Sequence, residues 1–466
     1  MSLFNWLCRY MAHFPNQIIK NENNSISYDE LIYEAGNKGR LISRCKVGIY
    51  CKSELNTARA VMRCIFAEAP AVLLSPRYGE KHCRRIIEQM QINYIITDIS
   101  GDIELRKINN GKLEEEHADL TNVSLILSTS GTTGAPKGSM LTSYGITANL
   151  MAIHNYLKLC ANDSILIARP LYHSAALIGE FLTALINGAE VNFIEGAFNP
   201  PAIVKEIISS EITTFCSTPT MFHHISHFAK RIKNLPLKTV SVSGECLTRT
   251  VAEEMQNIFK SAKIYHVYGL TEAGPRVSCL PPEEFSEHSE SVGYALPGIF
   301  AKIADESGNE MPRGESGELL LLTPSAMKGY YNQPAETENV FRNGWLHTGD
   351  IAKMDEHGRI TVLCRKDDMI IRGGINIYPR EIENVLCSIS GVDDAVAYGE
   401  RDALAGEKIR IKAAAPSMTA SDLLKKCRAL LPPYQWPDSV EIVDKLPRNS
   451  SGKIVRRTEK DERTGI

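Results

Sequence analysis

The sequence predicts an α/β protein with a large N-terminal domain and a smaller α+β C-terminal domain. From residue 123 onward, short apolar runs alternate with amphipathic helical stretches, which is the pattern of a parallel sheet covered by helices. After Pro281 the pattern changes to antiparallel strands with glycine-bearing turns, and it changes again after Arg365. We therefore expect two parallel-sheet subdomains and a small β-barrel-like subdomain within residues 1–366, and a mobile domain over residues 367–466.

The expected elements follow from these runs in order. Strands are predicted by apolar, β-rich segments at residues 46–52, 71–76, 93–99, 123–129, 164–170, 189–196, 212–219, 239–245 and 263–269. Helices are predicted between the later strands at 175–186, 201–210, 220–232 and 250–260. A hairpin is expected over 300–323 and a strand over 359–366. The C-terminal unit has helical patterns at 379–389 and 420–431, and strand patterns at 394–400, 408–415 and 439–445.

The composition indicates a globular protein without a strongly charged partner. Of the 466 residues, 43% are hydrophobic and 23% are charged, and the formal net charge of -3 argues against nucleic-acid binding. The 12 cysteines form no C-x-x-C pair, which suggests a reducing cytoplasm. We expect no membrane span, because nowhere do enough apolar residues follow one another. The N-terminal stretch "MSLFNWLCRYMAHFP" is interpreted as a docking helix, and the protein is expected to be a monomer or a homodimer.

A loop rich in glycine and hydroxyl residues, "STSGTTGAPKG" at 128–138, follows one of these strands. Ligands of α/β proteins bind beyond the carboxyl ends of strands, and glycine amides, hydroxyl groups and Lys137 suit a phosphate. A Walker A loop is excluded because Pro136 stands where that motif has glycine before its lysine. A flexible linker is the alternative interpretation. The expected phosphate-binding residues are Thr129, Ser130, Gly131, Thr132, Thr133, Gly134 and Lys137.

The loop is similar to the phosphate-binding signature of the adenylate-forming superfamily, which includes acyl- and aryl-CoA synthetases, peptide-synthetase adenylation domains and luciferase. "YGLTE" at 268–272 resembles its second signature. That resemblance implies that Tyr268 lies against adenine, with Gly269 beside it. It also implies that Thr271 contacts the α-phosphate or the carboxylate and that Glu272 holds Mg²⁺. "WLHTGD" at 345–350 resembles the third signature, which implies that Asp350 and Arg365 bind the ribose hydroxyls.

Two later stretches complete the resemblance. "RKDDMIIRGGINIYPREIE" at 365–383 resembles the crossover between the large and small domains, which implies a hinge at Asp367 and a pantetheine path along Gly373 and Gly374. "PRNSSGKIVRR" at 447–457 resembles the final signature, and it implies that Lys453 reaches the reacting carboxylate. A basic tail is the alternative interpretation for this last stretch.

The resemblance implies an enzyme that joins an organic acid to AMP, using ATP and Mg²⁺, and then passes the acyl group to a thiol. Lys453, Glu272, Thr271 and Lys137 are the expected catalytic residues. Amino-acid-activating relatives carry an aspartate where this chain has His173, so an aromatic or medium-chain acid is expected instead. Tyr172, His173, Val267 and Gly269 are the expected acid-binding residues, and Gly244 and Glu245 are expected beside adenine.

Three alternatives are left open at this point. The acceptor thiol belongs either to coenzyme A or to the phosphopantetheine of a carrier protein supplied in trans. A nucleotide-binding regulatory protein without catalysis is the third possibility. His223 and His227 have the i, i+4 spacing of a zinc site, but without an evident third ligand we interpret them as an ordinary helix face.

Overall fold

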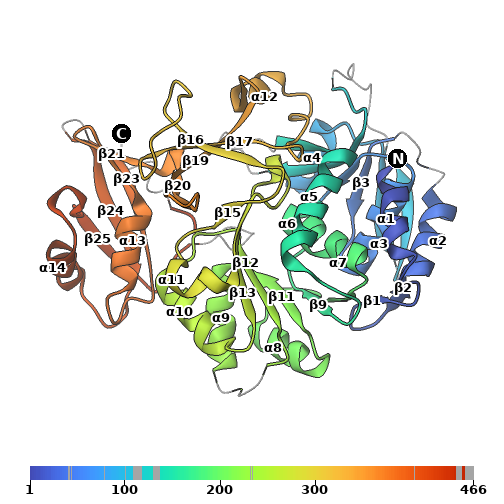
Figure 1. The fold of residues 1–466 in the computed structure, drawn as a ribbon, viewed down its shortest axis with the longest axis horizontal. Helices are drawn as coiled ribbons and strands as arrows, with labels where there is room; N and C mark the ends of the chain where they lie inside the picture. The colour runs from blue at the N-terminus through green and yellow to red at the C-terminus, as the bar shows by residue number, and fades with distance from the viewer. Residues whose placement is uncertain are drawn as a thin grey trace.

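The computed structural model describes residues 1–39, 42, 45–77, 79–99, 101–108, 118–129, 137–230, 232, 235–402, 405–447 and 454–456. Its sheets stand side by side across the molecule. The N-terminal sheet lies at the right of Figure 1, and the C-terminal unit, in orange and red, lies at the left. This arrangement of helices and sheets confirms the predicted α/β class.

The first sheet contains the strands that were expected in the N-terminal region. It runs in the order β6 (Asp102–Lys107), β5 (Tyr94–Ile99), β3 (Val47–Tyr50), β4 (Ala71–Leu73), β7 (Val123–Thr129) and β8 (Lys137–Thr142). The inner strands β5, β3, β4 and β7 are parallel, whereas β6 and β8 are antiparallel edges. Helices α2 (Tyr28–Gly39), α3 (Glu54–Phe66) and α4 (Glu80–Gln89) connect and cover these strands. The buried face of α1 (Leu3–Met11) makes it the docking helix that was expected.

Strand β8 is a departure from the expected layout around the glycine loop. The sequence suggested that a helix follows the loop, but β8 first pairs with β7, and helix α5 (Ser143–Leu157) begins only after it. Met140 and Leu141 of β8 are both buried, which explains why this short segment is held against the sheet. The Thr142 hydroxyl accepts a hydrogen bond from the Gly145 amide and caps α5.

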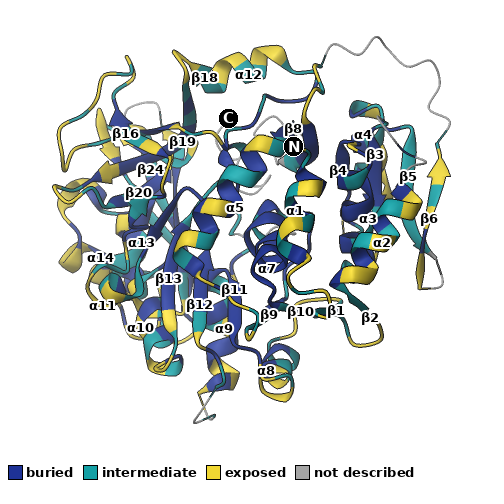
Figure 2. Ribbon diagram, turned by 45° about the vertical axis from the view of Figure 1, so that its right-hand side comes forward, coloured by how far each residue is buried: buried dark blue, intermediate teal, exposed yellow. Residues whose placement is uncertain are grey.

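The second sheet forms the centre of the molecule. Its order is β15 (Tyr294–Ala295), β14 (Ser278–Leu280), β13 (Lys263–Tyr268), β12 (Thr239–Ser243), β11 (Thr214–Ser217), β9 (Ser164–Ile167), β10 (Glu190–Phe193), β1 (Ile18–Lys20) and β2 (Ser25–Ser27). The strands from β13 to β1 are parallel. Helices α8 (Pro200–Ser209), α9 (Pro219–Ala229) and α10 (Arg249–Ile258) lie along one side of it, as Figure 2 shows, with their apolar faces in a shared core. The carboxyl ends of β12 and β13 lead into the predicted binding residues.

The helix expected over 175–186 is not a regular α-helix. It consists of α6 (Ser174–Ala176), the π-helix η2 (Leu177–Leu182) and α7 (Thr183–Asn187), and η2 is buried throughout. A π turn takes more residues per turn than an α-helix and is frequent at functional sites. Periodicity alone does not distinguish the two, because both bury the same apolar residues here.

The remaining sheets complete the chain. The antiparallel sheet predicted after Pro281 contains β16 (Phe300–Ala304), β17 (Ser316–Leu322), β19 (Trp345–Met354), β18 (Phe341–Arg342) and β20 (Ile360–Arg365), with α12 (Pro334–Val340) above it in Figure 1. The C-terminal sheet contains β22 (Ile375–Ile377), β21 (Ile370–Arg372), β24 (Gly406–Ala414), β23 (Asp394–Asp402) and β25 (Ser439–Val443). Helices α13 (Pro379–Cys387) and α14 (Ala420–Leu430) share a separate apolar core with it.

Candidate active site

The glycine and hydroxyl loop connects two paired strands. β7 ends at Thr129 and β8 begins at Lys137, and these residues stand opposite each other in the antiparallel register. The loop residues Ser130, Gly131, Thr132, Thr133 and Gly134 lie outside the described residues, as does the side chain of Thr129. The Lys137 side chain is described, and it contacts residues on the opposite side of the site.

Lys137 forms an ion pair with Glu336 of α12. Its ammonium group also lies over the ring of Tyr330, 5.3 Å from the ring centroid. The Tyr330 hydroxyl donates a 2.9 Å hydrogen bond to Oε1 of Glu272, the predicted Mg²⁺ ligand. Burial, together with the Glu272 carboxylate, raises the pKa of Tyr330, so the phenol stays protonated and remains a donor. Tyr330 therefore links the two charged residues that the sequence predicted separately.

Backbone hydrogen bonds hold residues 327–331 against strand β8 on one side and against Glu272 on the other. The Met327 amide donates to the Glu272 carbonyl over 2.7 Å, while the Met140 amide donates to the Gly329 carbonyl over 3.0 Å. These bonds fix the segment between β8 and Glu272, so that Tyr330 has a defined position. Neither Tyr330 nor Glu336 was predicted, because both belong to a stretch without a recognisable binding pattern.

A second group of contacts joins Tyr268, Asp350 and Arg365. The Tyr268 hydroxyl donates to Oδ2 of Asp350 over 2.5 Å, and the Arg365 guanidinium donates to Oδ1 of the same carboxylate over 3.0 Å. Asp350 is buried, with 6% of its surface exposed. Burial and the neighbouring Asp350 charge raise the pKa of Tyr268. Tyr268 ends β13 and Glu272 follows four residues later in η3 (Thr271–Ala273), so the two groups of residues meet at the carboxyl end of one strand.

The residues after β13 are held tightly beside this site. Gly269 has no room for a side chain, because a Cβ there would lie 1.9 Å from the Pro275 carbonyl oxygen. Thr271 shares a 3.1 Å hydrogen bond with the hydroxyl of Ser174, the first residue of α6. Val267 is buried and stands next to Ser243 of β12 in the sheet register. The predicted acid-binding residues Val267 and Gly269 thus lie at the carboxyl end of β13, beside the end of β12.

Tyr172 and His173 form a tilted ring pair at the start of α6, with ring centroids 4.3 Å apart. Glu54 supports the backbone just before them, because its Oε2 accepts a 2.9 Å hydrogen bond from the Leu171 amide. Burial raises the pKa of Glu54 to about 7. This carboxyl group was not predicted from the sequence, since a glutamate at the start of a helix is common.

Gly244 and Glu245 occupy the turn after β12. Gly244 has a φ of 98°, a backbone conformation that favours glycine. The Glu245 Oε2 accepts a 2.7 Å hydrogen bond from the Thr220 hydroxyl of α9. The turn is therefore held by side-chain contacts at the same sheet edge as Tyr268.

Asp367, the predicted hinge, lies in the short helix η5 (Lys366–Asp368) between β20 and β21, and its role as a hinge stays a prediction. Gly373 and Gly374 form the turn between β21 and β22, with φ angles of 58° and 81°, and are exposed. Lys453 lies outside the described residues. Arg456 is described, and it forms ion pairs with Glu383 and Asp368.

Arg380 of α13 joins the C-terminal unit to the large domain and was not predicted. Its guanidinium is buried and donates hydrogen bonds to the carbonyls of Leu247, over 3.0 Å, and Glu290, over 3.2 Å. It also donates to the Val362 carbonyl. In the sequence it stands among the charged residues of an amphipathic helix and gives no sign of these contacts.

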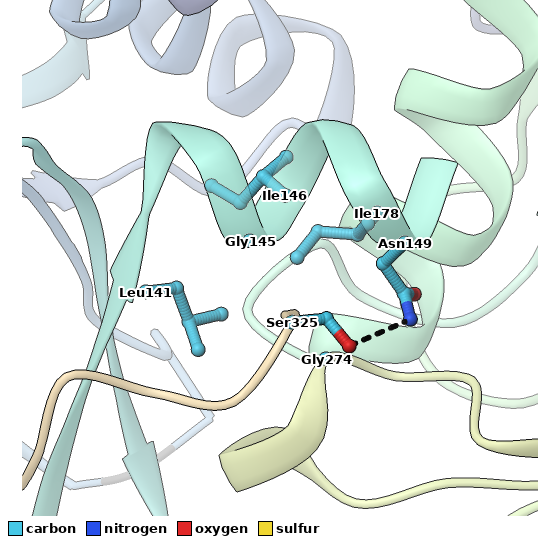
Figure 3. Close-up of a pocket in the computed structure, with 7 residues that line it drawn as sticks. All are labelled: Leu141, Gly145, Ile146, Asn149, Ile178, Gly274 and Ser325. Carbon is cyan, nitrogen blue, oxygen red and sulfur yellow. Dashed lines mark hydrogen bonds between the residues drawn. The ribbon is translucent and has the colours of Figure 1, made fainter. Parts of the chain in front are cut away.

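A small crevice beside helix α5 is drawn in Figure 3. It lies between α5, Ile178 of η2, Gly274 and Ser325, and a water molecule does not fit into it. Asn149 borders it and donates a 2.7 Å hydrogen bond to the Arg276 carbonyl. The crevice is therefore a packing gap that brings α5 close to residues 274–276.

Glu272 is the predicted metal ligand, and its surroundings fit that role. Within the described part of the chain only its Oε1 accepts a side-chain hydrogen bond, which leaves Oε2 for a hard cation. The rings of His223 and His227 pack edge to face with centroids 4.8 Å apart, and His223 pairs with Glu254. Among the described residues there is no cluster of three or more His, Cys, Asp or Glu that could hold a metal, so the zinc interpretation receives no support.

Two known family models match this chain. A model of the AMP-binding enzyme family matches residues 11–331, and a model of the AMP-binding enzyme C-terminal domain matches residues 381–453. The chain belongs to the AMP-binding enzyme family. This AMP-binding enzyme contains, in the part that the structure describes, no helix long and apolar enough to cross a membrane.

Several known proteins are similar to this AMP-binding enzyme. A long-chain-fatty-acid–CoA ligase of Escherichia coli is 36% identical over 345 residues, covering 72% of this chain and 61% of the ligase. The chain thus aligns with about three fifths of that relative. A feruloyl-CoA synthase of Amycolatopsis is 36% identical over 72% of this chain and 69% of its own length. The solved o-succinylbenzoate CoA synthetase of Bacillus subtilis, in complex with its acyl-adenylate, superimposes with a TM-score of 0.84 at 26% identity and covers 97% of both chains.

Proposed function

We propose that this AMP-binding enzyme is an AMP-forming ligase that joins an organic acid to the thiol of coenzyme A. The acid would first react with ATP to give an acyl-adenylate and pyrophosphate, and the acyl group would then pass to the thiol. The observation that carries the proposal is the hydrogen-bonded group of Tyr268, Asp350 and Arg365. Within it, Tyr268 stands four residues before Glu272, which accepts a hydrogen bond from Tyr330. A group suited to a nucleoside and a group suited to phosphates thus lie at the end of the same strand.

The reaction brings two anions together, so catalysis depends on position and charge. Lys137 and the amides of the glycine loop would bind the phosphates, and Asp350 with Arg365 would hold the ribose. Thr271 would contact the reacting carboxylate or the α-phosphate, and Lys453 would neutralise charge between them. A Mg²⁺ ion at Glu272 would offset phosphate charge when bound.

One of the relatives supports an aromatic acid, which is one of the two substrate classes expected from the sequence. Those that match at 36% identity are a ligase for long-chain fatty acids and a synthase for feruloyl-CoA. His173 at the start of α6 offers no carboxylate to an α-ammonium group, which disfavours an amino acid. Since each of these relatives is a CoA ligase or synthase, coenzyme A is the preferred acceptor, and no observation favours a carrier protein.

Acid-dependent exchange of labelled pyrophosphate into ATP tests the first step. We expect exchange with some members of an acid panel, and thioester formation when coenzyme A is added. The Lys453→Ala variant should lose exchange by ~10²-fold or more while still binding ATP. Wild-type protein without exchange for any acid would contradict the proposal, as would unchanged exchange in the variant.

We further propose that residues 367–466 rotate about Asp367 between the two steps. An Asp367→Pro variant should retain pyrophosphate exchange and lose thioester formation, because proline restricts the backbone change. The matched Asp368→Asn variant changes a neighbouring side chain and leaves the backbone free. Equal loss of both steps in Asp367→Pro would contradict a hinge at this residue.

A further inference from the structure

A charged cluster lies in the interior beside the predicted acid-binding residues. It consists of Arg169 after β9, Glu180 in η2 and Arg276 after η3 (Thr271–Ala273), which are 7%, 0% and 1% exposed. Arg169 and Glu180 form an ion pair. Arg276 donates a 3.0 Å hydrogen bond to the Pro275 carbonyl. Sequence reasoning assigned no role to any of these residues.

The cluster contains two guanidinium groups and one carboxylate. The other groups that act on Arg276 are Tyr156 and Cys216, and burial keeps both of them neutral by raising the pKa of Tyr156 and that of Cys216, the latter to about 12. The described residues therefore leave at least one positive charge uncompensated in the interior. Such a charge is costly unless an anion accompanies it.

The hydrogen bonds of the cluster are also incomplete. Among the described residues, Nε of Arg169, Nε of Arg276 and Oε2 of Glu180 are buried without a partner. Buried polar atoms are almost always hydrogen-bonded in folded proteins. Three atoms of one charged cluster therefore have hydrogen-bonding capacity that the described residues do not use.

The local fold makes room for Arg276 at a cost. Gly179 lies inside η2, and a Cβ there would lie 2.8 Å from Cζ and Nη2 of Arg276. Glycine within a helix is less favourable than alanine by roughly 1 kcal/mol. The π turn at the same residues is a second irregularity of a kind that is frequent at functional sites. Both features place the guanidinium next to η2.

The sheet opposite η2 carries small polar side chains. Thr214, Cys216, Ser241 and Ser243 alternate with Phe215, Val240 and Val242, which belong to the core on the other face of the sheet. The hydroxyl groups of Thr214, Ser241 and Ser243 are buried without a partner among the described residues. Ser243 neighbours the predicted acid-binding residue Val267. The charged cluster thus shares a sheet face with the predicted acid site.

We propose that Arg276, supported by the Arg169–Glu180 pair, binds an anionic group at the far end of the acid substrate. The substrate would then be an aromatic or medium-chain acid with a second carboxylate. This inference rests on the proposed ligase function. The second carboxylate compensates the buried positive charge and accepts the unused guanidinium hydrogen bonds.

The length of the acid follows from the helix. Ser174 contacts Thr271, where the reacting carboxylate is expected, and Gly179, which contacts Arg276, lies five residues further along. With the 1.5 Å rise of an α-helix this spacing would be roughly 8 Å, and it is shorter here because residues 177–179 belong to the π-helix η2. Extended medium-length diacids such as pimelate and suberate have carboxylates at about this upper limit, and aromatic diacids such as terephthalate have carboxylates that are closer together.

Matched pairs of acids test the proposal by pyrophosphate exchange. Each pair differs in the second carboxylate: suberate against octanoate, pimelate against heptanoate, and terephthalate against 4-methylbenzoate. We expect kcat/KM to favour the diacid at least tenfold in the pair of suitable length. In Arg276→Met this preference should disappear, with a ratio of about one, because an uncharged side chain replaces the guanidinium that pairs with the second carboxylate. Arg276→Lys keeps a charge and should retain part of the preference.

The outcomes separate this inference from the proposed function. Turnover of monoacids as good as that of diacids, with the ratio unchanged in Arg276→Met, would overturn the inference and leave the ligase function intact. If no acid supports exchange, the ligase function fails. Calorimetric binding of suberate to the wild type and to Arg276→Lys then decides the inference, and absence of binding to the wild type overturns it. Thermal unfolding of each variant shows whether it folds, and an unfolded Arg276→Met leaves Arg276→Lys as the deciding variant.

Discussion

Glu336 forms an ion pair with Lys137, and this pair should compete with the nucleotide for the lysine ammonium group. The pair joins a lysine side chain that is 15% exposed to a carboxylate that is 38% exposed. A triphosphate bound by the glycine loop would need the same ammonium group. We therefore expect Glu336→Gln, which keeps the shape and removes the charge, to bind ATP more tightly than the wild type.

The exposure of the pair sets the size of this effect. A partly exposed ion pair is worth up to about 1 kcal/mol, and releasing that amount tightens binding about fivefold. Glu336 also repels the phosphates, which adds to the effect in the same direction. Because salt screens exposed charges, the difference should shrink as the ionic strength rises.

Isothermal titration with a non-hydrolysable ATP analogue measures the effect without turnover. Glu338→Gln is the matched control, because Glu338 lies exposed on the same helix α12 and has no ion pair among the described residues. It should change the dissociation constant far less than Glu336→Gln. An unchanged or weaker affinity in Glu336→Gln would show that Glu336 does not compete for Lys137.

Three further variants test other contacts of the site and the core. Tyr330→Phe removes the hydrogen bond to Glu272. We expect half-maximal activity to need several-fold more Mg²⁺, while ATP binding in the absence of the metal is unchanged. Equal Mg²⁺ curves for the variant and the wild type would argue against a positioning role. Asp350→Asn removes the carboxylate that accepts from Arg365, and the ATP dissociation constant should rise about tenfold or more in the same titration, as for a lost charged hydrogen bond. Burial lowers the pKa of His266 to about 4 from 6.5, so the folded state binds fewer protons between these values and loses stability as the pH falls. Relative to His266→Gln, the wild type should lose roughly 3 kcal/mol of unfolding free energy between pH 7 and pH 4, and parallel pH profiles would contradict this.

The strands were predictable because each is an apolar run of the right length. The segments at 123–129, 239–245 and 263–269 became β7, β12 and β13. The predicted residue Tyr268 is the last residue of β13, and Gly244 follows directly after β12. Strand β8 was missed because its buried residues Met140 and Leu141 follow a glycine-rich loop and lack a clear alternation. The local sequence pattern thus predicts where a strand ends better than it predicts the structure of the residues that follow.

The contacts of the site depend on pairings that the sequence does not display. Tyr330 reaches Glu272 because residues 327–331 pair with β8, and that pairing joins segments far apart in the chain. Arg276 is read from the sequence as an ordinary polar residue after a motif. Its burial follows from a π turn and from Gly179, and neither changes the apolar periodicity of the helix.

Arg380 explains how a rotating C-terminal unit could also have a defined position. The hydrogen bonds of Arg380 to the large domain go to backbone carbonyls, among them those of Leu247 and Glu290. None of these acceptors is a carboxylate. Water replaces carbonyl acceptors readily, whereas breaking a buried ion pair would leave an unpaired charge behind. Arg456 binds Glu383 and Asp368. All three residues belong to the C-terminal unit, so they can move together. We infer that the charged pairs stay together during rotation, and that the contacts that must break are those that solvent can replace.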